Sequence, residues 1–427
     1  MRATRSLPPT SVLRARTAVA MSFSVSGVAF ASFMSRTPGV RDALGLSSAQ
    51  LGLLVLCLSG GSIVGLPLSG WIVHRLGSAR AVLTASLTVA AGLVPLAAGV
   101  HVGVVGPAAV GFVLIGIGIW DVAMNVEGAD VERRLGRPLM PRLHAAFSLG
   151  TVAGAGVGAA SAAAGVPLAV QVLAVAALVP TSMGIAVRFF LGALGKAAQE
   201  SSGSSGALVA WCEPRTLLIG LLVLGFAFTE GSANDWIAVA MVDGYGTSES
   251  VGAMGFGLFV SAMTAGRLIG GSAVQRFGRV AALRTSVITA TIGLLLVLLG
   301  GSTAWALAGA SLWGLGASLG FPVGMGAAAD DPLKAAVRLS VVCSIGYSAF
   351  LAGPPLIGLV AESAGILRAL LVVLGALALG LLTSGAARPS ARPLGHRDRS
   401  DRCLCRAEKR SKLRSPGARP RWCRRRV

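Results

Sequence analysis

The sequence GWIVHRLG at residues 70–77 recurs 201 residues later as GSAVQRFG at residues 271–278. A second pair of segments, 142–150 and 338–346, shares an Arg-Leu pair, a serine and a glycine at the same spacing, 196 residues apart. Two similarities at nearly the same offset indicate an internal duplication. The chain is therefore predicted to contain two structurally related halves.

The composition indicates a membrane protein. Of the 427 residues, 54% are hydrophobic and 13% are charged, whereas a soluble globular chain has about 25% charged residues. The mean hydropathy is +0.75, and apolar stretches that approach the roughly 20 residues needed to cross a bilayer recur along almost the whole chain. These features argue against a soluble enzyme, a disordered protein and a collagen-like fibre.

Twelve spans can be drawn, and they predict an all-α polytopic membrane protein with two pseudo-symmetric six-helix halves. The expected organisation is a basic N-terminus (1–15), an N-terminal half (16–190), a linker (191–214), a C-terminal half (215–385) and a disordered polybasic tail (386–427). The predicted spans are 16–35, 49–69, 80–100, 104–126, 142–163, 166–190, 215–238, 250–270, 280–300, 303–325, 336–358 and 365–385.

The distribution of basic residues predicts the orientation of these spans. The termini, the linker and alternate loops contain 33 of the 37 Lys and Arg residues, whereas the opposite loops contain only Arg36, Arg41 and Arg368. Loops rich in Lys and Arg remain in the cytoplasm. We therefore expect a multi-pass protein of the cytoplasmic (inner) membrane with both termini in the cytoplasm.

The N-terminus has a second interpretation. Several arginines followed by an apolar run and Ala29-Phe30-Ala31 are also compatible with a cleaved signal peptide. The internal repeat requires this segment as the first transmembrane span. We therefore prefer a retained span to a cleaved signal peptide.

The tail is compatible with four interpretations. Its 13 Arg, 2 Lys and 3 acidic residues from Arg388 onward are suited to anionic lipid headgroups at the cytoplasmic surface. Nucleic-acid binding is disfavoured because aromatic residues are nearly absent. Zinc ligation is disfavoured by irregular spacing, and an error in the coding frame near Ala386 is the fourth interpretation. The potential zinc ligands are His396, Cys403, Cys405 and Cys423.

The duplicated loop resembles the signature of the major facilitator superfamily, Gly-x-x-x-Asp-Arg/Lys-x-Gly-Arg/Lys-Arg/Lys. Residues 70–77 retain both glycines and Arg75, but His74 replaces the aspartate and the final basic pair is missing. The second copy retains Arg276, Gly278 and Arg279 and has Gln275 in the acidic position. In the family that aspartate contributes to a cytoplasmic charge network that stabilises one conformation. The resemblance implies a transporter fold with a weakened network in this loop.

A narrower resemblance links spans four and five to the fucose permease branch. GIGIWDVAMN at residues 116–125 is similar to that branch's Gly-x-Gly-x-x-Glu-x-x-x-Asn pattern, and LHAAFSLG at residues 143–150 is similar to its span-five pattern. By this match Asp121 replaces a carboxylate implicated in sugar binding and proton coupling. The branch also has an aspartate four residues before a proline in span one, and that position is Met34 if the proline is Pro38.

Intramembrane charges are expensive and are therefore candidate functional residues. Asp121 and Asn125 lie one helical turn apart and could bind a hydroxylated solute or a proton. The alternative is a structural pair between Asp121 and Arg142 or His144. In span seven, Glu230 and Asn234 share a helix face and are further substrate or proton-coupling candidates.

The remaining candidates have expected roles in gating, structure or cavity lining. Asp235 and Trp236 are expected at the membrane interface, and Arg267 is expected to reach the surface or pair with Asp330 or Asp331. The gating or structural charges are Arg75, Arg142, His144, Arg267 and Arg276. The candidate cavity-lining residues are Trp120, Trp313, Ser318 and Tyr347.

These observations predict a secondary active transporter that works by alternating access and moves a small polar, sugar-like solute. We expect an ion gradient to supply the energy, and protons are the candidate coupling ion. The alternatives are an exporter of amphipathic compounds and a transporter-like sensor without flux. No phosphate-binding loop or hydrolase motif is present in the sequence. We therefore expect a monomer without enzymatic activity, cofactor, metal or nucleic-acid partner.

Overall fold

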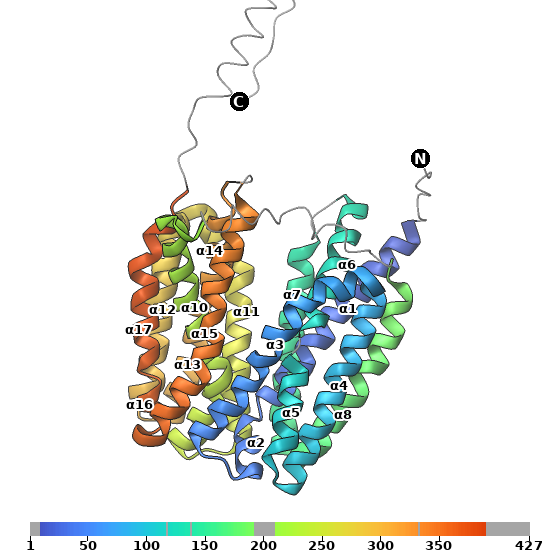
Figure 1. Ribbon diagram of the computed structural model, residues 1–427. Helices are drawn as coiled ribbons and strands as arrows, with labels where there is room; N and C mark the ends of the chain where they lie inside the picture. Colours follow the sequence, from blue (N-terminus) through green and yellow to red (C-terminus); the bar gives the residue numbers. More distant parts are fainter. Residues whose placement is uncertain (1–8, 117, 137–138, 192–209, 332–333, 390–427) are drawn as a thin grey trace, which may run out of the picture. The chain divides into compact units, whose positions relative to one another are not determined.

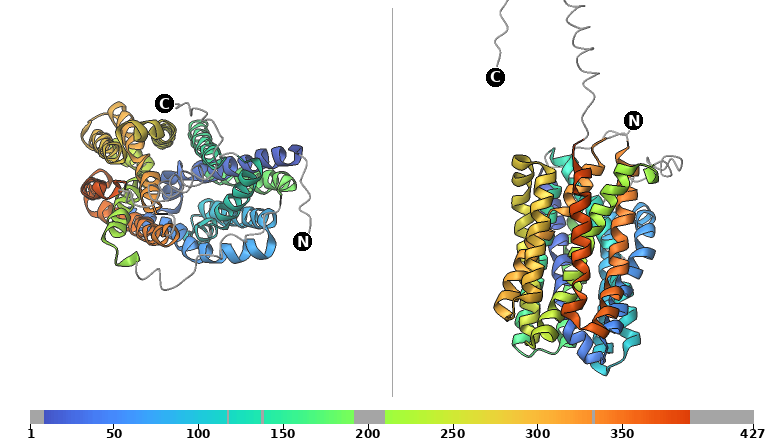
Figure 2. Two further views of the ribbon diagram at one scale, coloured as in Figure 1. Left: turned by 90° about the horizontal axis from the view of Figure 1, so that it is seen from above. Right: turned by 90° about the vertical axis from the view of Figure 1, so that its left-hand side faces the viewer.

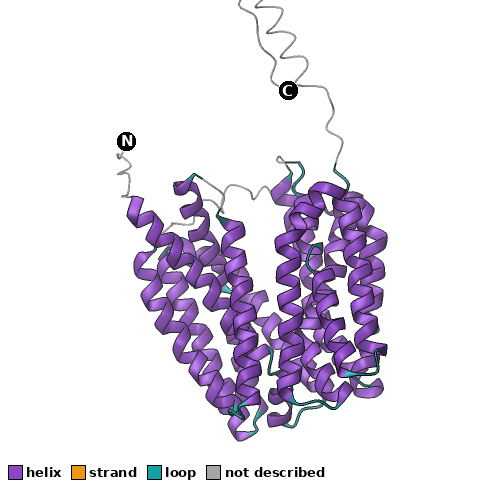
Figure 3. Cartoon of the chain, turned by 180° about the vertical axis from the view of Figure 1, so that it is seen from behind, coloured by secondary structure: helices purple, strands orange, loops and turns teal. Residues whose placement is uncertain are grey.

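The structure is a computed structural model of the chain. It describes residues 9–116, 118–136, 139–191, 210–331 and 334–389. Within these ranges the regular elements are helices and no β-strand is found (Figure 3). Most of the predicted linker, the tail and the four potential zinc ligands lie outside the described residues.

The first half is a bundle of helices connected by short turns (Figure 1). Its helices are α1 (Pro9–Met34), α2 (Thr37–Leu44), α3 (Ser48–Leu76), α4 (Ser78–Val102), α5 (Val105–Gly116), α6 (Ile119–Leu135), α7 (Met140–Ala163) and α8 (Leu168–Ala186), followed by the 3-10 turn η1 (Val187–Phe189).

The second half is a comparable bundle. Its helices are α10 (Pro214–Val239), which continues as the π-helical segment η3 (Ala240–Gly244), α11 (Glu249–Phe277), α12 (Arg279–Leu299), α13 (Thr303–Ala317), α14 (Gly320–Ala328), α15 (Ala335–Ala364), α16 (Ile366–Ala369) and α17 (Val372–Thr383), followed by the 3-10 turn η4 (Ser384–Ala387).

The predicted number of spans agrees with the structure. Among the described residues, 11 helical segments are long and apolar enough to cross a membrane, and the bent pair Thr37–Leu44 with Ser48–Ser62 would make 12. The short helix α2 was not expected from the sequence. Spans four and ten are each divided into two helices, α5 with α6 and α13 with α14.

The internal repeat predicted from the sequence also appears in the backbone. Gly77 and Gly278, at the ends of the two repeated segments, have nearly the same dihedral angles, φ 76° and ψ 160° against φ 82° and ψ 161°. This left-handed region strongly favours glycine, and each residue joins two long antiparallel helices. The duplicated sequence therefore encodes the same helix-to-helix turn in both halves.

Small residues allow helices within a half to approach closely. A Cβ atom on Gly150 of α7 would lie 2.1 Å from the backbone oxygen of Ser24 in α1, and one on Gly154 would lie 2.6 Å from that of Val28. Gly156, on another face of α7, has no such neighbour within 4 Å. The glycine spacing i, i+4 thus defines the α1–α7 contact.

The two bundles meet along α3 against α15 and α7 against α11. The helices are seen end-on in the left view of Figure 2. A Cβ atom on Gly52 would lie 2.4 Å from the backbone oxygen of Pro354, and Ser59 Oγ donates a hydrogen bond to the backbone oxygen of Phe350 at 2.8 Å. We call the end where α1 begins and α17 ends the terminal end, and the opposite end the distal end.

Candidate functional site

The candidate site lies at the break in span four. Gly118 separates α5 from α6 with φ 72°, a backbone conformation that side chains with a Cβ rarely adopt. The end of α5 is fixed because Ser62 Oγ of α3 donates to the backbone oxygen of Gly116 at 2.7 Å. A Cβ atom on Gly116 would lie 1.9 Å from the backbone oxygen of Leu58. The glycines recognised in the sequence therefore permit both the break and the close approach of α3.

Asp121 occupies the first turn of α6, directly after this break. The positive end of a helix dipole stabilises a carboxylate at this position. Asn125 Nδ2 donates hydrogen bonds to the backbone oxygen of Asp121 at 2.8 Å and to its Oδ1 at 3.2 Å. The structure therefore brings together the two residues that the sequence singled out, and the Asp121 side chain remains exposed.

A cavity of about 240 Å³ adjoins Asp121 inside the first bundle. It extends between α1, α4, α7 and the break of span four. Its polar side chains are Ser26, Thr88 and Asp121, and most of the other walls are apolar. The apolar lining includes Phe30, Phe33, Val89, Leu114, Ile115, Ile119, Trp120 and Phe147.

Trp120 forms part of the wall of this cavity. Its side chain is 5% exposed, and its Nε1 donates to Ser22 Oγ at 2.9 Å. This hydrogen bond fixes the indole between α6 and α1, so that the adjacent Asp121 is presented from a rigid turn.

The alternative interpretation of Asp121, a structural ion pair with Arg142 or His144, is not observed in the described part of the chain. No Lys, Arg or His nitrogen within the described ranges lies within 4 Å of its carboxylate. The ring of His144 packs edge-on against Phe23, with centroids 5.4 Å apart. Arg142 is exposed and lies beside a separate hollow with Arg16.

Glu230 and Arg267 form an ion pair within the second bundle. Arg267 Nη2 donates to both carboxylate oxygens of Glu230, at 2.9 and 3.0 Å. The expectation that Arg267 would pair with Asp330 or Asp331 was wrong, because the arginine side chain crosses from α11 to α10. The pair therefore joins α10 to α11 within the second half.

The end of span seven differs from the sequence prediction. Trp236 is completely buried, and its Nε1 has no hydrogen-bond partner among the described residues. The prediction that Trp236 lies at the membrane interface was therefore wrong, because the rotation of α10 directs this side chain into the bundle. Asp235 and Asn234 are half-buried in the distal half of the helix.

The other candidate lining residues have different environments. Tyr347 is 45% exposed and stacks on Phe321 with centroids 6.3 Å apart. Trp313 is completely buried against Phe259, and Ser318 is 1% exposed with its hydroxyl donating to the backbone oxygen of Leu315. Tyr347 is thus the most exposed of the four candidate lining residues.

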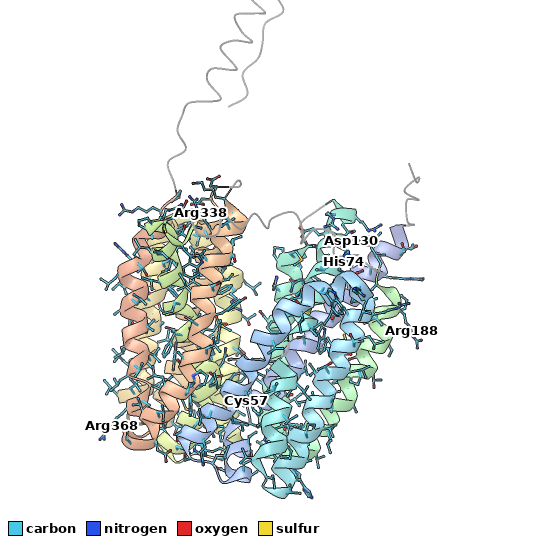
Figure 4. The ribbon with its side chains drawn as sticks, viewed as in Figure 1. Cys57, His74, Asp130, Arg188, Arg338 and Arg368 are labelled. Atoms are coloured by element: carbon cyan, nitrogen blue, oxygen red, sulfur yellow. The ribbon has the colours of Figure 1, made fainter. Side chains whose placement is uncertain are left out.

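Within the described part of the chain, the arginines of the two repeated segments form no ion pair with an acidic residue. Arg75 lies over the ring of Trp71 at 5.0 Å, and Arg276 lies over Phe277 at 5.4 Å. Both arginines are exposed, and Arg75 directly follows His74, which is labelled at the terminal end in Figure 4. The substitution of the signature aspartate is therefore accompanied by cation–π contacts.

A charge cluster at the terminal end was missed in the sequence analysis. Asp330 accepts hydrogen bonds from Arg215 and Arg279 at 2.7 Å each. Burial alone would raise the pKa of Asp330, but the two guanidinium groups outweigh burial and lower it. Arg279 belongs to the second copy of the loop signature, and this match is the sequence feature that could have indicated the cluster.

The second part of this cluster centres on Glu213. Arg338 Nε donates to its Oε2 at 2.6 Å, and Lys334 Nζ donates to its Oε1 at 3.2 Å. The hydrogen bond from Arg338 is the main cause that lowers the pKa of Glu213 to about 2. Arg338, at the terminal end in Figure 4, therefore stabilises the start of α10.

The fold and the site define a polytopic membrane protein with polar groups in both helical halves at membrane depth. The class is that of a transporter built from a duplicated six-helix unit. The family model described as Major Facilitator Superfamily matches residues 15–337. The chain belongs to this superfamily.

Relatives and solved structures agree with this assignment. An uncharacterized MFS-type transporter of Yersinia pestis is 32% identical over 86% of this chain and 93% of its own length. An uncharacterized transporter of Sinorhizobium fredii is 32% identical over 81% of this chain and 91% of its own length.

Solved structures support the fold at low sequence identity. A mutant of the nucleoside transporter NupG has a TM-score of 0.71 and 14% identity, covering 88% of this chain and 99% of its own. A bacterial homologue of the lysosomal transporter Spinster, in an inward-facing conformation, has a TM-score of 0.68 and 15% identity, covering 91% and 100%. The fucose:proton symporter of E. coli has a TM-score of 0.60 and 15% identity, covering 88% and 99%.

Proposed function

We propose that this protein is a secondary active transporter that moves a small polar, sugar-like solute across the cytoplasmic membrane by alternating access. The single observation that supports the solute site best is Asp121, an exposed carboxylate at the broken span beside a cavity of about 240 Å³. Asn125 adds an amide one turn away, and such a pair can bind hydroxyl groups. The fucose and nucleoside transporters among the structural neighbours are consistent with a hydroxylated solute.

We assign coupling to the same carboxylate. In the described residues no cation within 4 Å neutralises Asp121, whereas Glu230 is neutralised by Arg267. A free carboxylate at membrane depth can bind a proton or a cationic group and release it when the environment changes. We propose an ion gradient as the energy source, protons as its ion, and a cytoplasmic location of both termini.

The test is proton movement in sealed proteoliposomes that contain the purified protein. Addition of a panel of sugars and polyols is expected to drive proton entry for at least one member, and Asp121→Asn is expected to reduce this entry at least about 100-fold. Asp130→Asn is the matched control, since Asp130 lies in the same helix α6 and pairs with Arg133 and Arg134 away from the cavity. Equal proton entry in Asp121→Asn would contradict the assignment.

A second candidate function is favoured by the apolar walls of the cavity, which include Phe30, Phe33 and Phe147. Such walls suit an amphipathic cation whose charge lies near Asp121. The same proteoliposomes distinguish the candidates. Proton release on addition of tetraphenylphosphonium, together with no response to any sugar, would assign the protein to the exporters of amphipathic compounds.

A further inference from the structure

The two ends of the membrane unit use their charges differently. At the distal end, Arg36 of the first half binds Glu249 of the second half, with Nε–Oε1 at 2.8 Å and Nη2–Oε2 at 2.9 Å. Among the described residues at the terminal end, the ion pairs stay within one half. These terminal pairs join Asp130 to Arg133 and Arg134, Glu213 to Lys334 and Arg338, and Asp330 to Arg215 and Arg279.

Arg36 is held in place by its own half. Its Nη1 donates to the backbone oxygen of Val166 at 2.8 Å and to Oε1 of Gln171 at 3.0 Å. Gln171 is oriented in turn because its Nε2 donates to the backbone oxygen of Ser32 at 2.7 Å. Arg36 is only 5% exposed. The guanidinium is therefore a fixed group of the first half, whether or not the second half is in contact.

Glu249 is attached differently. It lies in the first turn of α11, and both hydrogen bonds described for its carboxylate come from Arg36. A Cβ atom on Gly39 would lie 2.3 Å from Glu249 Oε1, so α2 encloses the carboxylate closely. The dipole of α11 stabilises the negative charge when the arginine is absent. Glu249 can therefore leave with the second half without requiring rearrangement of the Arg36 site.

We propose that Arg36 and Glu249 form the distal latch, which closes the solute pathway at the distal end and must separate in each transport cycle. This inference rests on the alternating access of the proposed function. Arg41 and Asp243 also pair between the halves, but Arg41 shares its guanidinium with the exposed Asp42. Arg36 makes two hydrogen bonds to Glu249 and its side chain is more buried than that of Arg41, 6% against 15% exposed, so the Arg36–Glu249 pair is the main restraint.

The physical consequence is a shift of the conformational equilibrium. Removing one partner leaves the other charge buried and unpaired, which is unfavourable until the distal end opens and water reaches it. The neutral variants Glu249→Gln and Arg36→Gln are therefore expected to increase the distal-open population at least about tenfold. Arg368→Gln is the matched control, because Arg368 is an exposed arginine of the distal end for which the described residues contain no ion pair (Figure 4).

The experiment measures distances between spin labels in a background whose native cysteines are replaced by serine. One label pair uses His101→Cys and Ala304→Cys at the distal end, and the other uses His74→Cys and Gln275→Cys at the terminal end; all four positions are exposed. In lipid nanodiscs, Glu249→Gln is expected to lengthen the distal distance and shorten the terminal one, and Arg368→Gln is expected to leave both unchanged.

Unchanged distances at both ends in Glu249→Gln would overturn the latch. Arg36→Gln is the second variant, and Glu249→Gln decides alone if Arg36→Gln is not folded by size-exclusion chromatography. These measurements need no solute, so the two proposals fail separately. Loss of the Asp121 assignment leaves the distance result intact, and a failed distance result leaves proton-coupled transport intact.

Discussion

Two acidic residues in the membrane-spanning helices, Asp121 and Glu230, differ in whether the carboxylate is paired with an arginine. Asp121 is hydrogen-bonded to Asn125 of the next turn, whereas Glu230 accepts two hydrogen bonds from Arg267. A paired carboxylate is already compensated, and separating it from its arginine is costly unless water or another cation replaces it. We therefore treat Asp121 as the solute or proton residue and the Glu230–Arg267 pair as a support that keeps α10 and α11 together.

Glu213 lies just before α10, where its carboxylate accepts hydrogen bonds from Arg338 and Lys334. Its lowered folded-state pKa of about 2, against an ordinary 4.5, means that its ionised form stabilises the fold. That stabilisation is complete above about pH 4.5 and is lost as the pH falls toward 2. Arg338→Gln is expected to lower the unfolding temperature by about 2–4 °C at pH 7, and the difference from the parent should narrow below pH 4.5.

Thermal unfolding of the purified protein in detergent between pH 7 and pH 3 measures this difference. Arg188→Gln serves as the control, because Arg188 is exposed and no ion pair is described for it (Figure 4). A difference between parent and Arg338→Gln that stays constant down to pH 3 would show that Arg338 does not act through the charge of Glu213.

At the scale of elements, glycines decide where helices can touch. Gly61 of α3 faces the backbone of α5, so that a Cβ atom there would lie 2.1 Å from the backbone oxygen of Val113. A Cβ atom on the adjacent Gly60 would meet no atom of a neighbouring described helix within 4 Å. Two consecutive glycines of one helix therefore have opposite environments.

Alanine substitutions at the two positions should therefore have opposite effects on stability. Gly61→Ala is expected to destabilise the protein by about 1–3 kcal/mol, because a backbone oxygen cannot move aside cheaply. Gly60→Ala should be neutral or stabilising by up to about 1 kcal/mol, since alanine favours the helix. Thermal unfolding in the same detergent compares the two variants, and equal effects would contradict the described packing of α3 on α5.

The sequence was sufficient to predict features that depend on spacing along one chain. The duplicated segments predicted two related halves, which share the turns at Gly77 and Gly278, and the spacing in GIGIWDVAMN placed Asp121 and Asn125 one helical turn apart. Contacts between helices were less predictable, because they depend on how each helix is rotated. The same uncertainty led to the wrong location of Trp236 and the wrong partner for Arg267.

In the whole membrane unit, the ion pairs at the two ends connect different parts of the chain. The distal latch joins the halves at one end, while the terminal pairs described above hold each half together separately. This arrangement favours a conformation in which the halves separate at the terminal end, since the latch is then intact. If the Lys- and Arg-rich terminal end is cytoplasmic, the solute site of this conformation is reached from the cytoplasm.

The final prediction tests that orientation. Green fluorescent protein fused after Thr383 is expected to fluoresce, and alkaline phosphatase fused at the same place is expected to be inactive, because the first folds in the cytoplasm and the second requires the periplasm. Fusions after Gly301, in the distal turn between α12 and α13, should give the opposite pair of results. Active phosphatase after Thr383 would reverse the orientation and would make the distal latch the cytoplasmic closure. The latch would still restrain the same end of the molecule, but its separation would then admit solute from the cytoplasm.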